Sequence, residues 1–234
     1  GVTGLSGAPQ NPVGSDSPTE QLVVRGIGTS QVGGDTTSAP PVVAAYVDGV
    51  YSGLGSAYDV DQIEILRGPQ GTLYGRSATA GILVLNTRNP DIDKASGYAL
   101  AEAGNYQAFH FEGAINIPLG EKVAVRVSGS HRESDGFDTP DGGHTKNDSV
   151  RAKVLFQPSD RVSLLIAGAL ENQRSNTGGV SLVQLLPGGP IARDILPIGA
   201  LDFKQRQIWP KLDVDLGPAT LTYLPAYRTY TQSG

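Results

Sequence analysis

The feature that most restricts the fold is a repeated alternation of apolar and polar residues from Gly97 onward. In residues 107–117 the apolar members of the alternation are Phe109, Phe111, Ile115 and Ile117. The polar members between them are His110, Glu112 and Asn116. A period of two residues places the two sets on opposite faces of an extended strand. This part of the chain is therefore predicted to be an antiparallel β structure with one apolar and one polar face.

The same alternation recurs along the chain, and it predicts about seven strands. Their ranges are 97–103, 106–117, 122–130, 149–157, 161–171, 206–215 and 219–230. In 122–130 and 149–157, valine and phenylalanine again alternate with small or charged residues, among them Arg126 and Lys153. Alternation alone fits a soluble sheet as well as a membrane barrel.

The connections between these strands alternate in length after the tight turn at Gly104-Asn105. The segments 118–121, 157–160 and 216–219 are short, whereas 131–148 and 172–205 are long and polar. Outer-membrane barrels have short periplasmic turns on one rim and long loops on the other. A soluble sandwich has no reason to sort its loops in this way, so the pattern favours a barrel.

Composition removes several classes of function. The 234 residues include no cysteine, which excludes thiolate catalysis, thiolate metal ligation and disulfides. The three histidines are scattered, so we expect no dedicated metal site. The net charge of −5 argues against a nucleic-acid partner. No nucleophile elbow or paired-carboxylate cleft is visible, so we expect no enzyme, no catalytic residue and no cofactor.

Glycine punctuates the N-terminal part, most densely in EILRGPQGTLYGRSATAG, residues 64–81. This segment imitates a phosphate-binding loop, but the spacing is wrong. The first glycine of that motif would fall at Gln70, and Arg76 stands where lysine is required. Short apolar runs at 22–25, 42–47 and 82–85 are expected to be strands, and 61–66 a short helix or strand. The N-terminal part is therefore predicted to be a small α+β unit with long loops.

Read in order, five segments of this unit resemble the plug domain of TonB-dependent outer-membrane receptors. They are VRGIG (24–28), YVDGVY (46–51), QIEILRGPQGTLYGR (62–76), SATAG (77–81) and NTRNP (86–90). Order and spacing match over about 70 residues. Ala80 and Val84 depart mildly from the residues usual in the family. The later strands resemble the beginning of the family's barrel.

The resemblance implies an α+β plug domain at 1–92, without its N-terminal part, followed by antiparallel transmembrane β-barrel strands at 93–234. About seven strands make an incomplete barrel, because bacterial barrels need an even number of at least eight. Open edges are costly in lipid. We therefore expect the chain to be part of a longer receptor.

The resemblance also implies where plug residues act. One set of motif residues is expected to form the tight turns of the plug and its polar contacts with the surrounding barrel. They are Arg25, Glu64, Arg67, Gly68, Pro69, Gly71, Tyr74, Gly75, Arg76 and Gly81. The alternative is that these residues only stabilise the plug's own fold. Candidate wall partners on the polar strand face are His110, Glu112, Arg126 and Lys153.

Three residues in outward-facing plug loops are candidates for substrate binding: Gln31, Tyr51 and Tyr58. Each offers hydrogen bonds or an aromatic face, although each fits an ordinary exposed loop equally well. Asp48 and Asp59 are interpreted as turn residues. Four tyrosines fit either the aromatic girdles at the membrane interfaces or ordinary strand positions. They are Tyr98, Tyr106, Tyr223 and Tyr227.

The function implied by the resemblance is TonB-dependent uptake of a scarce ligand, most often a ferric siderophore, across the outer membrane. The implied partners are TonB with ExbB and ExbD, outer-membrane lipid and the ligand itself. The alternative from another class is a soluble β-rich binding or scaffold protein that retains a plug-like module. Fractionation with outer membranes and dependence on detergent would distinguish the two.

Overall fold

A computed structural model gives the fold over residues 5–8, 21–24, 27–28, 43–51, 57–67, 81–135, 144–177, 180–184, 191–195 and 199–233. Every regular element in these residues is a β-strand. The segment 61–66, which the sequence left open between helix and strand, lies in a strand. The helical part of the α+β expectation is not found in the described residues. None of their segments is a helix long and apolar enough to cross a membrane.

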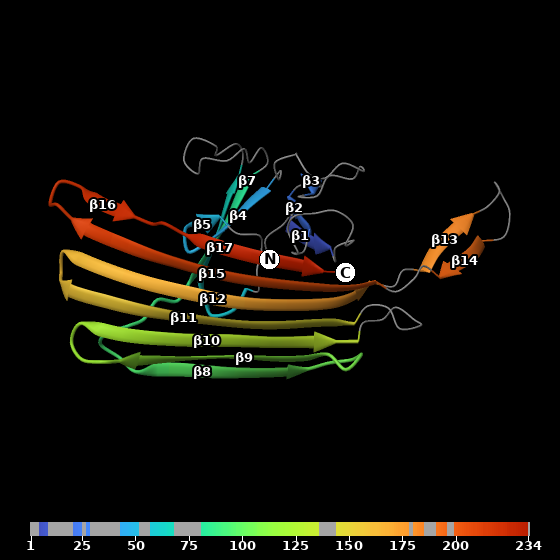
Figure 1. Cartoon of the computed structure of the whole chain (residues 1–234), viewed down its shortest axis with the longest axis horizontal. Coiled ribbons are helices and arrows are strands. Elements are labelled where there is room, and N and C mark those ends of the chain that lie inside the picture. The colour runs from blue at the N-terminus through green and yellow to red at the C-terminus, as the bar shows by residue number, and fades with distance from the viewer. Residues whose placement is uncertain are drawn as a thin grey trace.

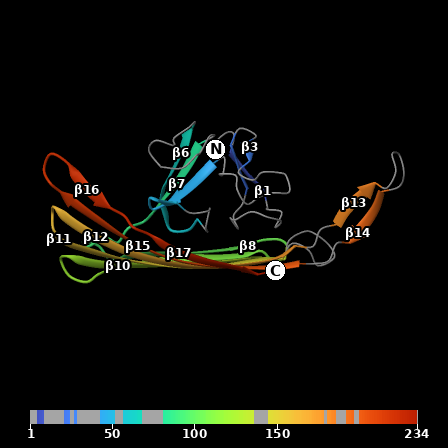
Figure 2. The same cartoon turned by 45° about the horizontal axis from the view of Figure 1, so that its top comes forward.

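One large antiparallel sheet contains most of the C-terminal part (Figure 1). Its strands are β8 (Ser96–Ala103), β9 (Phe109–Pro118), β10 (Val123–Ser134), β11 (Thr145–Ser159), β12 (Val162–Thr177), β15 (Gly199–Asp215), β16 (Thr220–Tyr223) and β17 (Tyr227–Ser233). Their order is β16-β15-β12-β11-β10-β9-β8, and β17 continues the edge beside β15. The sheet curves without closing, because β8 does not pair with β16 or β17 (Figure 2).

Each predicted strand is present, and several extend further than the alternation indicated. β10 continues to Ser134 and β11 begins at Thr145, so the connection predicted at 131–148 is shorter than expected at both ends. The last predicted strand is interrupted between Tyr223 and Tyr227. Pro225 lies there, directly across from Pro210 in the register shared by β16 and β17. Two prolines cannot donate ladder hydrogen bonds, which explains the break.

The two faces of the large sheet differ as the alternation predicts. Large apolar side chains on the outer face are 39–58% exposed: Phe109, Phe111, Ile115, Ile117, Val127, Val150, Val154, Phe156, Ile166, Leu170 and Ile208. The inner face is mostly polar and buried; its members include Asn116, Arg126, Ser128, Arg151, Lys153 and Gln207. An exposed apolar face of this extent indicates a surface made for a non-aqueous environment.

The connections sort by length to opposite ends of the sheet. The turns β9–β10, β11–β12 and β15–β16 lie together at one end (Figure 1). The connection between β12 and β15 lies at the other end and contains the hairpin of β13 (Val180–Gln184) and β14 (Ile191–Ile195). The predicted arrangement of short turns on one rim and long connections on the other is confirmed.

A separate four-stranded sheet forms the centre of the N-terminal unit, by which we mean the described residues up to Pro90. Its order is β5 (Val50–Tyr51), β4 (Val43–Val47), β7 (Gly81–Thr87) and β6 (Val60–Arg67). β4 and β7 pair in parallel, whereas β6 and β7 pair antiparallel. Tyr46, Ile82 and Val84 form its apolar core. A smaller sheet contains β1 (Leu5–Ala8), β2 (Gln21–Val24) and β3 (Ile27–Gly28).

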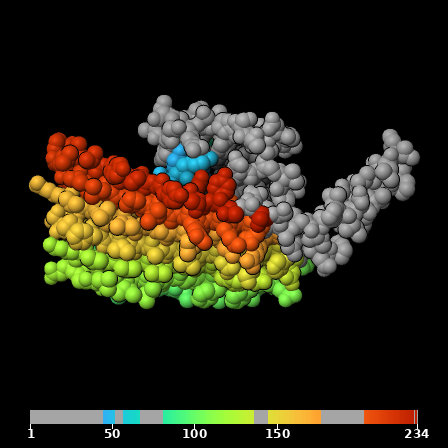
Figure 3. Space-filling view, in the orientation of Figure 1, coloured from blue at the N-terminus to red at the C-terminus, as the bar shows by residue number. Residues whose placement is uncertain are grey.

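The N-terminal unit lies on the concave side of the large sheet (Figure 2). In the space-filling view its described residues, in blue, abut the last strands of the sheet, in red (Figure 3). The contact is close: a Cβ added at Gly49 would lie 2.9 Å from Leu224 Cδ2. The polar inner face of the large sheet is thus covered by a folded unit.

Candidate functional site: the interface between the N-terminal unit and the large sheet

The first contact of the interface is built on the turn between β4 and β5. Asp48 and Gly49 have φ values of 51° and 81°, the left-handed pair that a two-residue hairpin turn requires. The Asp48 carboxylate accepts hydrogen bonds from the Thr87 backbone N–H (2.8 Å) and the Thr87 hydroxyl (2.7 Å). These bonds fix the carboxylate at the surface that faces the large sheet.

Lys153 of β11 is the partner of this carboxylate. Its Nζ lies 3.0 Å from Asp48 Oδ2, and the side chain is 2% exposed. Nζ also donates to the Thr87 carbonyl oxygen (3.1 Å) and to Asn89 Oδ1 (2.9 Å). A buried ammonium group needs such a set of acceptors, because desolvation of an unpaired charge costs several kcal/mol.

The second contact pairs Asp59 with Arg126 of β10. Arg126 Nε donates to Asp59 Oδ2 at 2.7 Å, and Nη2 donates to Oδ1 in the same fork. The two side chains are 6% and 2% exposed. Asp59 also has a left-handed backbone, with φ 51°, and its carbonyl oxygen accepts from the Arg88 N–H. The bidentate geometry is the strongest form of a carboxylate–guanidinium contact.

Two further side chains of β9 hold backbone groups of the N-terminal unit and of the segment that follows it. Glu112 Oε1 accepts from the Asp59 N–H at 3.0 Å and from the Tyr98 hydroxyl. Asn116 accepts from the Asp91 N–H (2.9 Å) and donates to the carbonyl oxygens of Asp91 and Lys94. The inner face of the sheet therefore recognises main-chain as well as charged groups.

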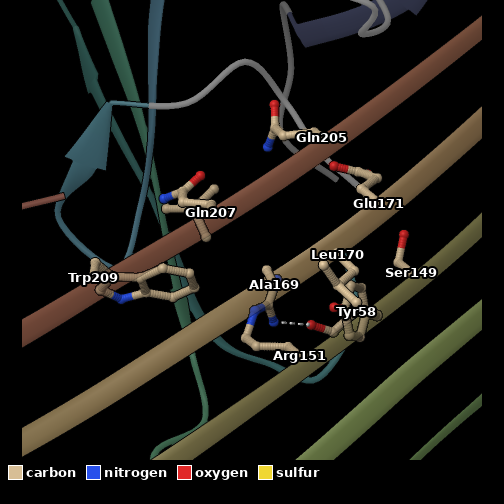
Figure 4. Close-up of a pocket in the computed structure, with 10 residues that line it drawn as sticks. Tyr58, Ser149, Arg151, Ala169, Leu170, Glu171, Gln205, Gln207 and Trp209 are labelled. Carbon is tan, nitrogen blue, oxygen red and sulfur yellow. Dashed lines mark hydrogen bonds between the residues drawn. The ribbon is translucent and has the colours of Figure 1, made fainter. Parts of the chain in front are cut away.

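Between the two ion pairs, Tyr58 packs against Arg151 of β11. The guanidinium carbon of Arg151 lies 4.3 Å from the centre of the Tyr58 ring, and Nη1 donates to the Tyr58 carbonyl oxygen at 3.3 Å (Figure 4). A cation over an aromatic face is attracted by the ring quadrupole. Burial raises the pKa of the Tyr58 phenol to about 12, so the phenol is neutral at ordinary pH.

Strand register explains why these wall residues are neighbours. Arg126 pairs with Asn116 on one side and with Lys153 on the other. Arg151 lies two residues along β11 from Lys153, on the same face. Three cations thus form one basic patch opposite two carboxylates of the N-terminal unit. The arrangement can hold that unit in place through a few strong contacts, and removal of one partner of a buried pair is costly, at about 3–5 kcal/mol.

Three of the four expected wall residues, Glu112, Arg126 and Lys153, contact the N-terminal unit. His110 instead contacts Glu102 of β8, with 2.8 Å between His110 Nδ1 and Glu102 Oε2. Of the two settings considered for Tyr98, the interfacial girdle is wrong and the strand tyrosine is correct, because its hydroxyl donates to Glu112 on the inner face. Tyr223 and Tyr227 are exposed on the last strands.

Most of the motif residues assigned to plug contacts lie outside the described residues: Arg25, Gly68, Pro69, Gly71, Tyr74, Gly75 and Arg76. Gly81 begins β7, where it pairs with Val43 and Arg67. Glu64 is half-buried on β6, and among the described residues no ion pair includes it. The role of these residues stays a prediction.

The substrate candidates occupy different settings. Gln31 lies outside the described residues. The half-buried Tyr51 ring packs edge-on against Tyr46, with 5.7 Å between the ring centres, and its carbonyl oxygen faces Arg228. Tyr58 is 3% exposed and fastens the N-terminal unit to the sheet, so its ring is not open to a ligand in this structure. Substrate binding by the three residues stays a prediction.

Sequence reasoning missed the carboxylates of the interface, because Asp48 and Asp59 were interpreted only as turn residues. Both are turn residues, as their positive φ values show. A usable signal existed: each is an acidic residue at a rigid turn, opposite a polar strand face that carries Arg126 and Lys153.

Comparison with known proteins supports this architecture. Residues 1–82 match the family model described as TonB-dependent Receptor Plug Domain. Over 132 residues the chain is 49% identical to the pesticin receptor of Yersinia enterocolitica, an alignment that covers 52% of this chain and 20% of the receptor. It is 29% identical to the ferrioxamine B receptor of Salmonella typhimurium over 152 residues, an alignment that covers 59% of this chain and 20% of that receptor. The aligned region is thus about a fifth of either receptor.

Two solved structures have the same fold over nearly the whole chain. The ferric yersiniabactin uptake receptor FyuA from Yersinia pestis superposes with a TM-score of 0.79 at 22% identity, covering 100% of this chain and 38% of the receptor. The ferripyoverdine-binding FpvA of P. aeruginosa superposes with a TM-score of 0.73 at 15% identity, covering 96% of this chain and 30% of FpvA. The N-terminal unit and the large sheet therefore correspond to a plug and an arc of barrel wall.

Proposed function

We propose that the chain forms the plug domain and the first barrel strands of a TonB-dependent receptor, and that it acts in energised uptake of a scarce ligand across the bacterial outer membrane. The match of residues 1–82 to the plug-domain model and the fold shared with FyuA support this proposal. The observation that carries the proposal is the fastening of the plug to the inner wall by two buried ion pairs, Asp48–Lys153 and Asp59–Arg126. A transporter of this kind needs a plug that closes the lumen at rest.

The proposed ligand is a ferric siderophore. The names of the relatives support this class, because ferrioxamine B and ferric yersiniabactin are iron chelates. The proposed partners are TonB, acting with ExbB and ExbD, which transmit the energy of the inner-membrane proton gradient to the plug. Outer-membrane lipid is the proposed partner of the apolar outer face. Gln31 and Tyr51 are proposed to contact the ligand, with the plug ending near residue 92.

The alternative of a soluble β-rich binding or scaffold protein is disfavoured by one observation. A soluble sheet would present a polar outer face, whereas the exposed residues here include Phe109, Phe111 and Phe156 at 43–45% exposure. A contiguous apolar face of this kind would aggregate in water. Transport of the ligand, rather than its chemical conversion, is the proposed activity.

Deletion of the gene in its native host tests the proposal directly. We expect the deletion strain to lose uptake of radioactive iron from one siderophore within a panel that includes ferrioxamine B, yersiniabactin and pyoverdine. A strain without TonB should lose the same uptake, while vitamin B12 uptake is a control for general TonB function. Normal uptake of every chelate by the deletion strain, or recovery of the protein in the soluble fraction, would contradict the proposal.

A further inference from the structure

The plug and the wall are connected by residues 91–95, which join the end of the plug at Pro90 to the first wall strand, β8. The residues of this connecting segment are exposed or half-buried, and none of them belongs to a strand. A connection of this kind between two folded units is usually a flexible linker that lets them move freely. The hydrogen bonds of the connecting segment indicate that it is instead held in place.

Asn116 of β9 binds the connecting segment through its whole side-chain amide. Its Oδ1 accepts from the Asp91 N–H at 2.9 Å, and Nδ2 donates to the carbonyl oxygens of Asp91 (2.9 Å) and Lys94 (2.7 Å). Both N–H groups of the amide are thus used, and Asn116 is only 1% exposed. A fourth bond lies within the segment, where Asp91 Oδ1 accepts from the Asp93 N–H at 2.8 Å and closes a turn.

These four bonds do not depend on the plug. Asn116 lies inside the β-ladder, where it pairs with Ser96 of β8 on one side and with Arg126 of β10 on the other. Each of the four bonds joins the connecting segment to β9 or to itself, and none uses a group of the plug. The bonds of Arg126 and Lys153 differ, because their partners are plug residues and are lost when the plug undocks. The connecting segment should therefore keep its place on β9 after the plug has left the wall.

We propose that Asn116 is a positioning residue that fixes the connecting segment to the wall, so that the moving part of the plug ends at Pro90. The inference rests on the proposed function, in which the plug moves. β7 ends at Thr87, four residues before Asp91. An extended chain spans at most about 3.5 Å per residue, so this end of β7 stays within about 14 Å of Asp91. Because β7 lies between β4 and β6, an intact plug sheet can swing about this end but cannot move away from β9 as a whole.

Native-state hydrogen exchange of the full-length protein in detergent tests the inference. At urea concentrations that undock the plug, the amides of β6 and β7 should exchange through undocking. The Asp91 amide should stay protected under these conditions and exchange only together with the amides of β8 and β9. Asp91 is exposed, so its amide depends on the bond to Asn116 for this protection. Exchange of the Asp91 amide in step with β6 and β7 would overturn the proposal.

Variants of Asn116 test the same point in the resting protein. Asn116→Ala removes three hydrogen bonds and should speed exchange of the Asp91 amide by at least about tenfold, whereas Asn116→Gln, which keeps the amide, should restore part of the protection. The control is Asn172→Ala, which removes the same amide from β12, a strand that pairs with neither β8 nor β9, and should leave the Asp91 amide protected. Equal protection of this amide in Asn116→Ala and the wild type would overturn the proposal. These measurements need neither ligand nor TonB, so their failure is distinct from a loss of uptake.

Discussion

The ion pair between Asp59 and Arg126 is predicted to be a principal fastening of the plug. Asp59→Asn is the sharpest perturbation, because asparagine tolerates the left-handed backbone at φ 51° and removes only the charge. The change leaves Arg126 buried without its counterion. Breaking a buried pair in this way costs about 3–5 kcal/mol. The undocked fraction of the plug should therefore rise roughly a hundred- to several-thousand-fold.

A double-mutant cycle measures this contribution. Asp59→Asn, Arg126→Gln and the double variant are compared by urea-induced undocking, followed through hydrogen exchange of the amides in β6 and β7. We expect a coupling energy of at least about 2 kcal/mol, well above the additivity limit. The control is the partly exposed pair Asp202–Lys204 on β15, in which Asp202 also contacts Arg174; it should couple by less than about 1 kcal/mol. A coupling below about 0.5 kcal/mol for the buried pair would refute the reasoning.

Three further predictions concern the same interface. Lys153→Met should weaken the free energy of plug docking by a similar amount, about 3–5 kcal/mol, because it leaves a plug carboxylate buried without its cation. The same hydrogen-exchange assay measures this loss. Gly49→Ala should destabilise docking more than Gly120→Ala. Both glycines have positive φ, but a Cβ at Gly49 would lie 2.9 Å from Leu224 Cδ2 and force that side chain to move, whereas a Cβ at Gly120 would meet nothing within 4 Å; equal urea midpoints would contradict this. Docking of the wild-type plug should weaken by about 2–3 kcal/mol as pH rises from 10 to 12, because burial raises the pKa of Tyr58 from 10.0 to about 12 and only the undocked phenol ionises in that window. Tyr58→Phe should lack this alkaline loss in a pH series of urea midpoints, and an unchanged loss in the variant would exclude Tyr58 as its source.

The wall could be predicted from sequence in considerable detail, since alternation acts on every strand independently. Period two predicted that Arg126 and Lys153 lie on the polar face, and the resemblance assigned that face to the inside of the barrel; both assignments are confirmed. The rim ends of the strands were missed, for instance residues 131–134 of β10. Above the apolar band both faces of a strand are polar, so the alternation disappears although the ladder of hydrogen bonds continues.

The partners across the interface could not be predicted in the same way. Asp59 and Arg126 are 67 residues apart, and nothing local indicates that they meet. Glu64 was equally suitable by charge, but it is half-buried on β6 and takes part in none of the ion pairs among the described residues. Backbone geometry therefore decides which of the described acidic residues meet the wall. Asp48 and Asp59 do so because each occupies a tight turn at the surface of the plug that faces the sheet.

The most direct test of the account is a covalent tether between plug and wall. The chain contains no cysteine, so Asp59→Cys with Arg126→Cys introduces the only thiols in these residues. A short bis-methanethiosulfonate, which forms a disulfide with each cysteine and releases a sulfinate, should link them in high yield in outer membranes. The link should block the proposed ligand uptake, and reduction should release the block. Asp59→Cys with Phe111→Cys, made together with Arg126→Gln so that no guanidinium group is left unpaired, places the second thiol on the outer face of the same sheet and should not link. Equal linking of the two pairs would show that the N-terminal unit does not lie on the inner wall, and would contradict the account.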